Sequence, residues 1–220
     1  MESEVDVVLP CLDEAEALPA VLAGIPAGWR AIVVDNGSSD GSGAIAERLG
    51  ATVVYASERG YGAAVHAGLS AATAAIVAFC DADGSFDLRQ LERVVAPVRA
   101  GTADLVLARR VPTRFGAWAP HARFANAVLL WWVRRRVPVD VHDLGPMRAG
   151  RTADLRALGM QDRRSGYPLE LLLRAQRRGW RIAEVPVDYL PRVGRSKVTG
   201  TIRGTAQAVR DMSVMLRRFA

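Results

Sequence analysis

Short apolar segments alternate with longer segments of helical composition along the first half of the chain. The short segments have the length and apolar character of buried strands, and we expect strands at residues 5–10, 30–34, 51–56, 75–80 and 105–108. Between them we expect helices at residues 14–23, 42–49, 62–74 and 88–100. Helices of this length provide crossover connections, which favours an α/β fold with a mostly parallel sheet.

After Arg110 the pattern becomes less regular. A loop at 112–120 contains proline and aromatic residues, and the elements expected after it are helices at 123–136, 167–178 and 201–218 and strands at 139–141 and 182–188. The chain shows no internal repeat and no low-complexity linker. We therefore expect a single domain over residues 1–220, with a donor- or cofactor-binding half at 1–110 and an acceptor-side half at 111–220.

The composition is that of an ordinary globular protein, with 50% hydrophobic and 24% charged residues among 220. The formal net charge of +6 is consistent with an anionic partner and equally with a solubilising surface rich in arginine. Cys11 and Cys80 lie in apolar segments without the spacing of a metal site, which is typical of a reduced protein. Without a secretory signal or an apolar run long enough to span a bilayer, a cytoplasmic location is expected.

The most informative segment is the apolar run at 76–80, which ends in Asp81-Ala82-Asp83. Ligands of parallel α/β sheets bind at the carboxyl ends of the strands. Two carboxylates separated by one residue at such an end can reach a divalent cation that carries a diphosphate. Because Asp83-Gly84-Ser85 is also ordinary turn or helix-cap chemistry, this segment alone leaves both interpretations open.

Two other expected strands also end in polar residues, Asp13-Glu14 after the first and Asp35-Asn36-Gly37-Ser38 after the second. The second of these segments favours an Asx turn when taken in isolation. Acidic groups at one edge of a sheet, however, repel one another unless a cation or a donor-rich ligand joins them. Arg59-Gly60-Tyr61-Gly62 opens a helix, where the glycines permit close backbone approach and the helix N-terminus favours an anion. The spacing matches neither a dinucleotide fingerprint nor a Walker motif.

Together these segments resemble the family 2 glycosyltransferases. The residues that carry the resemblance are Val7-Val8-Leu9-Pro10-Cys11-Leu12-Asp13-Glu14, Val33-Val34-Asp35-Asn36-Gly37-Ser38-Ser39-Asp40-Gly41, Arg59-Gly60-Tyr61-Gly62-Ala63-Ala64 and Asp81-Ala82-Asp83-Gly84. It continues more loosely through Asp143-Leu144-Gly145-Pro146-Met147-Arg148, Gly166-Tyr167-Pro168-Leu169-Glu170 and Gly194-Arg195-Ser196-Lys197. The similarity is greatest to polyprenyl-phosphate sugar synthases of the dolichyl-phosphate mannose or glucose type. The resemblance implies the GT-A fold, a Rossmann-like three-layer sandwich around a mostly parallel sheet.

The resemblance also implies roles for individual residues. It places a nucleotide-sugar pocket at Pro10, Leu12, Glu14, Asp35, Gly37, Arg59, Gly62, Asp81, Ala82 and Asp83. Within this pocket Asp35 would accept from the base, Asp81 would lie near the ribose or sugar, and Asp83 would hold Mg²⁺ or Mn²⁺ on the donor diphosphate. A bound divalent ion neutralises the charge that develops on a departing nucleoside diphosphate.

The acceptor side offers several candidates. A lipid phosphate is already an anion, whereas a hydroxyl acceptor needs a general base, for which Glu170 is the first candidate and Asp143 the second. Glu170 is equally well explained as a helix-surface residue, and Asp143 as a residue that orders nearby arginines. Arg195 and Lys197 could close over phosphates or belong to a solvated basic loop. Further candidates for the acceptor phosphate are Arg110, Arg123, Asp143, Arg148 and Ser196.

Residues 125–133 contain two tryptophans and precede three arginines, a pattern typical of an interfacial helix, although core packing also explains it. The sequence thus predicts an inverting, metal-dependent transfer of a hexose from a donor of the UDP-glucose or GDP-mannose type, with polyprenyl phosphate as the leading acceptor. A soluble hydroxyl acceptor and a non-catalytic nucleotide-sugar-binding protein are the alternatives. No nucleic-acid partner is expected, whereas a homodimer and peripheral contact with the inner face of the cytoplasmic membrane stay open.

Overall fold

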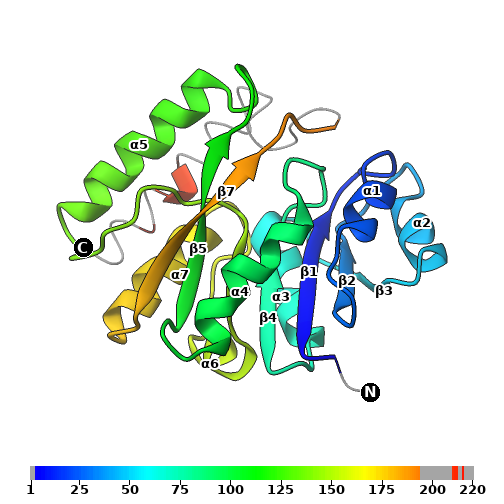
Figure 1. Cartoon of the computed structure of the whole chain (residues 1–220), viewed down its shortest axis with the longest axis horizontal. Helices are drawn as coiled ribbons and strands as arrows, with labels where there is room; N and C mark the ends of the chain where they lie inside the picture. Colours follow the sequence, from blue (N-terminus) through cyan, green and yellow to red (C-terminus); the bar gives the residue numbers. More distant parts are fainter. Residues whose placement is uncertain (1–2, 194–209, 213–214, 216–220) are drawn as a thin grey trace.

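The protein is a sheet covered by helices on both faces, and the computed structural model describes residues 3–193, 210–212 and 215 (Figure 1). The sheet has seven strands in the order β3-β2-β1-β4-β6-β5-β7. In chain order the strands are β1 (Val5–Cys11), β2 (Arg30–Asp35), β3 (Thr52–Tyr55), β4 (Ile76–Phe79), β5 (Leu105–Pro112), β6 (Arg148–Arg151) and β7 (Ile182–Tyr189). Because β1 lies between β2 and β4, its carboxyl end is flanked by the carboxyl ends of both strands.

Of these seven strands only β6 runs antiparallel to its neighbours, β4 and β5. The remaining strands point the same way, so their carboxyl ends share one edge of the sheet. Because β6 runs in the opposite direction, its first residue, Arg148, lies at that same edge, opposite Phe79 of β4 and Leu107 of β5. The prediction of an α/β fold with a mostly parallel sheet is confirmed.

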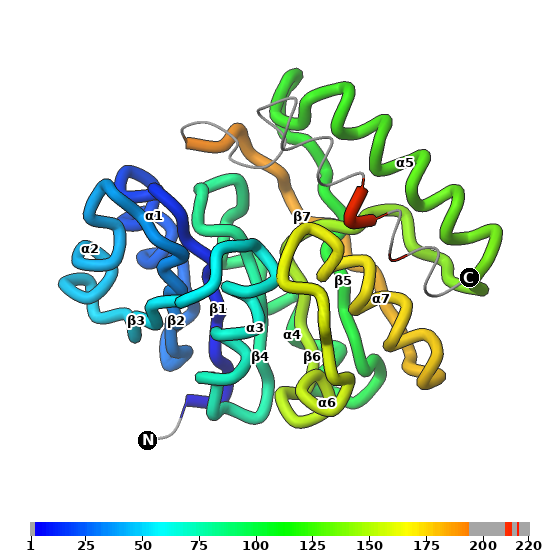
Figure 2. Tube along the Cα trace, turned by 180° about the vertical axis from the view of Figure 1, so that it is seen from behind, coloured from blue at the N-terminus to red at the C-terminus, as the bar shows by residue number. Residues whose placement is uncertain are grey.

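The helices form an outer layer on each face of the sheet. They are α1 (Leu18–Ala23), α2 (Ser42–Arg48), α3 (Tyr61–Ala71), α4 (Leu91–Arg99), α5 (Pro120–Arg134), α6 (Thr152–Ala157) and α7 (Tyr167–Arg177), with a short 3₁₀ turn, η1 (Leu88–Gln90), before α4. Alternate residues of β1 divide between the two layers: Val7 packs in the core that includes residues of α1 and α4, and Val8 in the core that includes residues of α3 and α7. Figure 2 shows the second face, with α3, α6 and α7.

The expected boundaries differ from the structure in places with clear local causes. Helix α1 begins at Leu18 rather than at residue 14, because Asp13 adopts a left-handed conformation (φ 52°) and residues 13–15 are hydrogen-bonded to the loop after β2. The expected strand at 139–141 is irregular chain. Strand β5 continues beyond residue 108, because β7 pairs with it as far as Pro112.

Strand β6 and helix α6 were not predicted. Strand β6 has the sequence Arg148-Ala149-Gly150-Arg151, which lacks an apolar or alternating pattern. It is nevertheless almost wholly buried, because it inserts between β4 and β5, where the space beside Gly150 is filled by Leu155 of α6. Tertiary packing, rather than strand propensity, determines this element.

The expected helix at 201–218 lies almost wholly outside the described residues, and so do Arg195, Ser196 and Lys197. Of that helix, Met212 and Met215 pack against the core that contains α7. Within the described part of the chain, no helix has both the length and the apolar character needed to cross a membrane.

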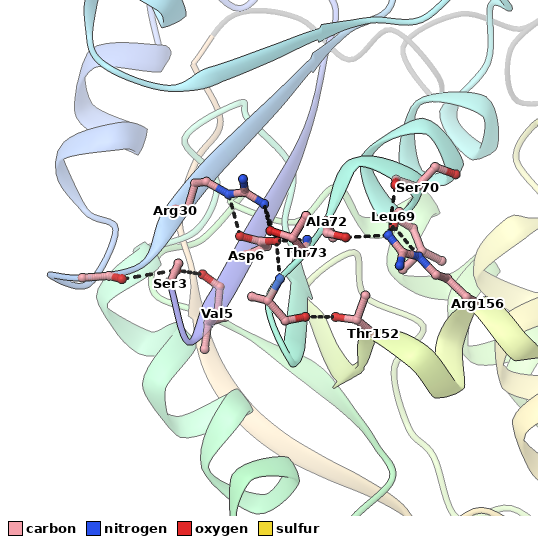
Figure 3. Close-up of polar contacts among 12 residues, drawn as sticks. Ser3, Val5, Asp6, Arg30, Leu69, Ser70, Ala72, Thr73, Thr152 and Arg156 are labelled. Carbon is pink, nitrogen blue, oxygen red and sulfur yellow. Dashed lines mark hydrogen bonds and ion pairs between the residues drawn. The ribbon is translucent and has the colours of Figure 1, made fainter. Parts of the chain in front are cut away.

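The amino edge of the sheet is held by a dense polar network (Figure 3). The fully buried Asp6 of β1 accepts from the Arg30 guanidinium at 2.7 and 2.8 Å and from the amides of Thr73 and Ala74 at 2.6 and 2.9 Å. Arg156 of α6 donates to carbonyl oxygens at the end of α3, among them those of Leu69 and Ser70. The network fixes the turn between α3 and β4, and thereby the position from which β4 runs to the carboxyl edge.

Candidate functional site

The loops after β1 and β2 are joined by hydrogen bonds between side chains and backbone. The Ser38 and Ser42 hydroxyls accept from the amides of Asp13 and Glu14 at 3.0 and 2.9 Å, and the Asp13 carboxylate accepts from the Ser39 amide at 2.7 Å. The predicted donor residues Pro10, Leu12 and Glu14 are therefore held, partly buried, at the carboxyl end of β1.

Asp35 forms the Asx turn that its sequence favours. Its Oδ1 accepts from the amides of Gly37 and Ser38 at 3.0 and 2.7 Å, and its side chain is almost fully buried. Arg59 reaches the same turn, since a Cβ added to Gly37 would lie 3.3 Å from its Nη2 atom. The structure thus brings together Asp35, Gly37 and Arg59, three residues of the predicted nucleotide-sugar pocket. The turn needs a residue with a positive φ, and Gly37, with a φ of 92°, adopts this conformation without steric cost.

The glycines that open α3 make room for protein rather than for a ligand. The amides of Gly62 and Ala63 donate to the carbonyls of Arg164 and Arg163 at 3.1 and 2.8 Å, and a Cβ on Gly62 would lie 2.7 Å from the Arg163 carbonyl carbon. The expected anion site at this helix N-terminus is therefore filled by the loop at 162–164. The glycines were predicted to let a ligand approach the backbone, whereas in the structure the backbone of residues 162–164 approaches it.

Two carboxylates lie at the end of β4. Asp83 is 3% exposed; its Oδ1 accepts from the Ser85 amide at 2.9 Å and its Oδ2 pairs with the Arg192 guanidinium. Burial, and then the charge of Asp83, raise the pKa of Asp81 to about 7, against the opposing effect of Arg192, Arg148 and Arg110. A raised pKa means that this pocket disfavours a second negative charge and would accept a further cation.

Arg148, at the start of β6, is 2% exposed and donates to the carbonyls of Gly145 and Pro146 at 2.9 and 3.2 Å. Arg110 of β5 forms a bidentate pair with Asp143 at 2.7 and 2.8 Å and lies 3.9 Å from the centre of the Trp118 ring. Asp143 therefore orders an arginine, which was one of the two interpretations of its sequence, and its carboxylate is already engaged as an acceptor. Both arginines are fixed in place by their surroundings.

Glu170 does not fit the predicted role of a general base. Its side chain is fully buried, and its two oxygens accept from the amides of Gln161 and Asp162 at 2.7 to 3.1 Å and from Arg174 Nε at 2.7 Å. A carboxylate with this many donors in a buried place anchors the loop between α6 and α7. Its interpretation as a helix-surface residue is wrong as well, because it faces the interior.

Arg123 is exposed on α5. Arg192, which follows β7, pairs with Asp83 and is not among the residues predicted from the sequence. The one sequence signal near it is the basic segment after the last expected strand, which contains Arg195 and Lys197.

The carboxylates at the end of β4 suit a hard divalent cation in their chemistry. Within the part of the chain that the structure describes, no three His, Cys, Asp or Glu residues are arranged to hold a metal ion. Asp83 alone would supply a protein oxygen, and a diphosphate would supply others, which is an ordinary arrangement for Mg²⁺. A cationic group, the Arg192 guanidinium, already lies against Asp83, which shows that the position accepts positive charge.

The sequence profile of glycosyl transferase family 2 matches residues 6–137, and the chain belongs to this family of sugar-transferring enzymes. The relative named uncharacterized glycosyltransferase Rv0539, from Mycobacterium tuberculosis, is 53% identical over 94% of this chain and 95% of its own length. The undecaprenyl-phosphate mannosyltransferase of Micrococcus luteus is 31% identical over 90% of this chain and 89% of its own.

Among solved structures, glucosyl-3-phosphoglycerate synthase from Mycobacterium tuberculosis was crystallised with Mn²⁺, UDP-glucose and phosphoglyceric acid. It superimposes with a TM-score of 0.75 and 23% identity over 99% of this chain and 79% of its own. The predicted GT-A fold and the predicted family are confirmed.

Proposed function

We propose that this glycosyltransferase moves a hexose from a UDP- or GDP-sugar to a polyprenyl phosphate, with inversion at the anomeric carbon and with Mg²⁺ or Mn²⁺ as cofactor. The observation that carries the proposal is the grouping of Asp81 and Asp83 with Arg110, Arg148 and Arg192 at the carboxyl edge. Carboxylates suit the cation of a donor diphosphate, and arginines suit phosphate oxygens. The Mn²⁺ and UDP-glucose bound by the structural neighbour support the same assignment.

The donor would lie over the first half of the chain, residues 1–110. Asp35 and Arg59 line the end of β2, where a nucleoside would be recognised, and the half-buried loop at 10–14 lines the end of β1. A divalent ion bound through Asp83 would neutralise the leaving diphosphate. The protein's own contribution is to hold these groups before the donor arrives, since the loops are fixed by hydrogen bonds of 2.7 to 3.0 Å.

The acceptor would approach from the side of β5, β6 and β7. An oxygen of the acceptor phosphate forms the new bond to the anomeric carbon while the bond from that carbon to the donor diphosphate breaks, and the electron pair leaves with the diphosphate. Arg148 and Arg110 would balance the acceptor's charge. The engagement of Glu170 and Asp143 as structural acceptors favours a phosphate, which needs no general base, over a hydroxyl.

Helix α5 offers a surface suited to the membrane in which a polyprenyl phosphate resides. Phe124, Val128, Trp131 and Trp132 are 42% to 72% exposed, and the guanidinium groups of Arg135 and Arg136 lie 4.0 and 3.8 Å from the two indole rings. Aromatic side chains beside arginines match the boundary between acyl chains and anionic headgroups. We infer peripheral binding to the inner face of the cytoplasmic membrane through this helix.

The proposal is tested by presenting purified protein and Mn²⁺ with radiolabelled UDP-glucose or GDP-mannose and three acceptors: undecaprenyl phosphate, undecaprenol and 3-phosphoglycerate. We expect label in the lipid phosphate alone. Label in 3-phosphoglycerate alone would show that the acceptor is a soluble phosphate compound and not the lipid phosphate. Transfer to undecaprenol would contradict the argument from phosphate chemistry.

A further inference from the structure

The chain that leaves β7 returns to the end of β4. Tyr189 forms an antiparallel bridge with Phe86, the Leu190 amide donates to the Ser85 carbonyl at 2.9 Å, and the Val193 amide donates to the Asp83 carbonyl at 2.9 Å. The Val193 side chain lies over Gly84, where an added Cβ would be 3.3 Å from its Cγ2 atom. Residues 189–193 are thus fastened to the loop that carries the candidate metal ligand.

This connection places the Arg192 guanidinium on Asp83. The Asp83 side chain is 4% exposed and that of Arg192 is 29% exposed, so the pair is shielded from bulk water on one side and open on the other. The pair uses Oδ2, the oxygen of Asp83 that does not accept from the Ser85 amide. A divalent ion that binds Asp83 through Oδ2, the oxygen that does not accept from the loop, meets the Arg192 guanidinium there.

A guanidinium and a divalent ion at the same carboxylate oxygen repel each other. Like charges a few ångströms apart in a partly buried place repel by several kcal/mol, at about 4 kcal/mol for 4 Å and an effective dielectric constant of 20. Asp81 lies in the same electrostatic environment and interacts with Arg192. A displaced guanidinium therefore has a second carboxylate nearby and does not need to leave the pocket.

We propose that Arg192 occupies the cation position on Asp83 in the free protein and that the divalent ion displaces it, which frees the guanidinium to contact the phosphate of the acceptor. The inference rests on the proposed metal-dependent function. It gives the segment at 189–193 a regulatory role: the metal changes the partner of Arg192, so metal binding and recognition of an anionic substrate are coupled through one side chain.

The test is Mn²⁺ binding, followed by the electron paramagnetic resonance signal of the free ion, with saturating UDP or GDP and no acceptor. In Arg192→Gln the competing cation is gone, and we expect the Kd for Mn²⁺ to fall about twofold to fivefold, the range for removing one partly exposed ion pair. Arg192→Lys retains a cation and should resemble the wild type. Arg89→Gln is the matched control, because Arg89 pairs with the nearby Asp87 at 2.9 Å outside the site.

A second measurement uses the unaltered protein. The side-chain resonances of arginine are recorded while diamagnetic Mg²⁺ and nucleoside diphosphate are added, with Arg192 assigned by its absence in Arg192→Gln. We expect the Arg192 signal to shift in step with metal occupancy, and to respond less to nucleotide alone.

The outcomes separate the two proposals. Mn²⁺ binding by the wild type with an unchanged or weaker Kd in Arg192→Gln overturns the displacement and leaves the metal site intact. Absence of Mn²⁺ binding by the wild type with either nucleotide overturns both the displacement and the metal-dependent function.

Discussion

The two edges of the sheet carry many charged residues, and they use them in opposite ways. At the amino edge Asp6 accepts from one guanidinium and two amides, and Arg156 donates to successive carbonyls at the end of α3. At the carboxyl edge Asp81 has a raised pKa, and the arginines around it are held by other partners. Charges at the first edge are matched within the protein. At the second edge Arg110 and Asp83 also have ion-pair partners, but the raised pKa of Asp81 shows that a further carboxylate there is poorly stabilised as an anion.

The difference shows how one fold separates stability from function. A buried charge with a full set of partners holds its surroundings in place, and losing one partner is costly. Charges left incompletely neutralised lower stability locally, but they bind an incoming cation and anion strongly. Substitutions at the amino edge should therefore affect folding, and substitutions at the carboxyl edge should affect binding and turnover.

The largest expected effect is at Asp6. In Asp6→Ala the Arg30 guanidinium, whose side chain is 35% exposed, and the amides of Thr73 and Ala74 lose their buried acceptor, and we expect the free energy of unfolding to fall by about 2–4 kcal/mol. Urea denaturation followed by circular dichroism measures it. Turnover per folded molecule should stay near that of the wild type. A loss of turnover without a loss of stability would contradict the assignment of the amino edge to stability.

Asp83 is the corresponding residue at the carboxyl edge. We expect Asp83→Asn to lower hexose transfer by about 10²–10³-fold while the free energy of unfolding falls by only about 1–2 kcal/mol, because asparagine still accepts from the Ser85 amide. Initial rates at saturating Mn²⁺ measure the effect. Asp104→Asn is the matched control, because Asp104 pairs with Arg181 at 2.7 Å on exposed chain near the amino edge. Full activity in Asp83→Asn would show that the assigned metal ligand is wrong.

A substitution at Glu170 tests whether this buried carboxylate on the acceptor side contributes to stability or to catalysis. Its substitution by glutamine weakens the bonds to the Gln161 and Asp162 amides and to Arg174, and we expect a loss of about 1–3 kcal/mol in unfolding free energy. The rate of transfer by the folded fraction should fall less than about tenfold. A fall of about 10³-fold at unchanged stability would restore Glu170 as a general base.

We expect substitutions on the exposed face of α5 to affect only the binding of the protein to membranes. We expect Trp131→Ala with Trp132→Ala to weaken binding to anionic vesicles about tenfold, since each ring buries apolar area at the interface. Vesicle co-sedimentation measures it. The control is Tyr55→Ala, which removes an exposed aromatic residue (64% exposed) from β3, the outermost strand on the other side of the sheet. An equal loss of vesicle binding in both variants would show that α5 is not the membrane-binding surface.

The smallest predicted effect is a dependence on pH at the amino edge. Burial raises the pKa of Asp6, but the hydrogen bonds from Arg30 and from the amides of Ala74 and Thr73 outweigh it, so the pKa lies below its ordinary value of 3.8. A carboxyl group with a lowered pKa in the folded state contributes stability above its unfolded pKa and loses that contribution as the pH falls through the folded value. Below about pH 4 the wild type should therefore lose stability more steeply than Asp6→Asn, as measured by urea denaturation at a series of pH values.

The sequence predicted the parts of this protein that depend on local pattern. The apolar runs predicted β1, β2, β4 and β7, and they placed Asp35, Asp81 and Asp83 at or just after strand ends, where the structure has them, because strands and their terminal loops are contiguous in the chain. The sequence failed where remote segments decide the outcome. Strand β6 has no pattern of its own and exists only between β4 and β5.

The same limit applies to the site residues. Glu170 looked like an available base because nothing in the sequence shows that the amides of residues 161 and 162 fold onto it. Arg192 is separated by 109 residues from the aspartate with which it pairs, so only the folded chain reveals their contact. The fold class and the acidic centre were thus predictable, whereas the partners of each charge were not.

The most direct test of a metal-dependent donor site at the carboxyl edge is a thermal-shift panel of UDP-, GDP- and dTDP-sugars with and without Mn²⁺, on the wild type and on Asp83→Asn. A ligand that binds only the folded state at about 100 times its Kd should raise the melting temperature by about 5–10 °C. We predict such a rise for a UDP- or GDP-sugar in the wild type, dependent on Mn²⁺ and absent in Asp83→Asn. A rise of equal size in both proteins, or none with any of these donors, would contradict the account.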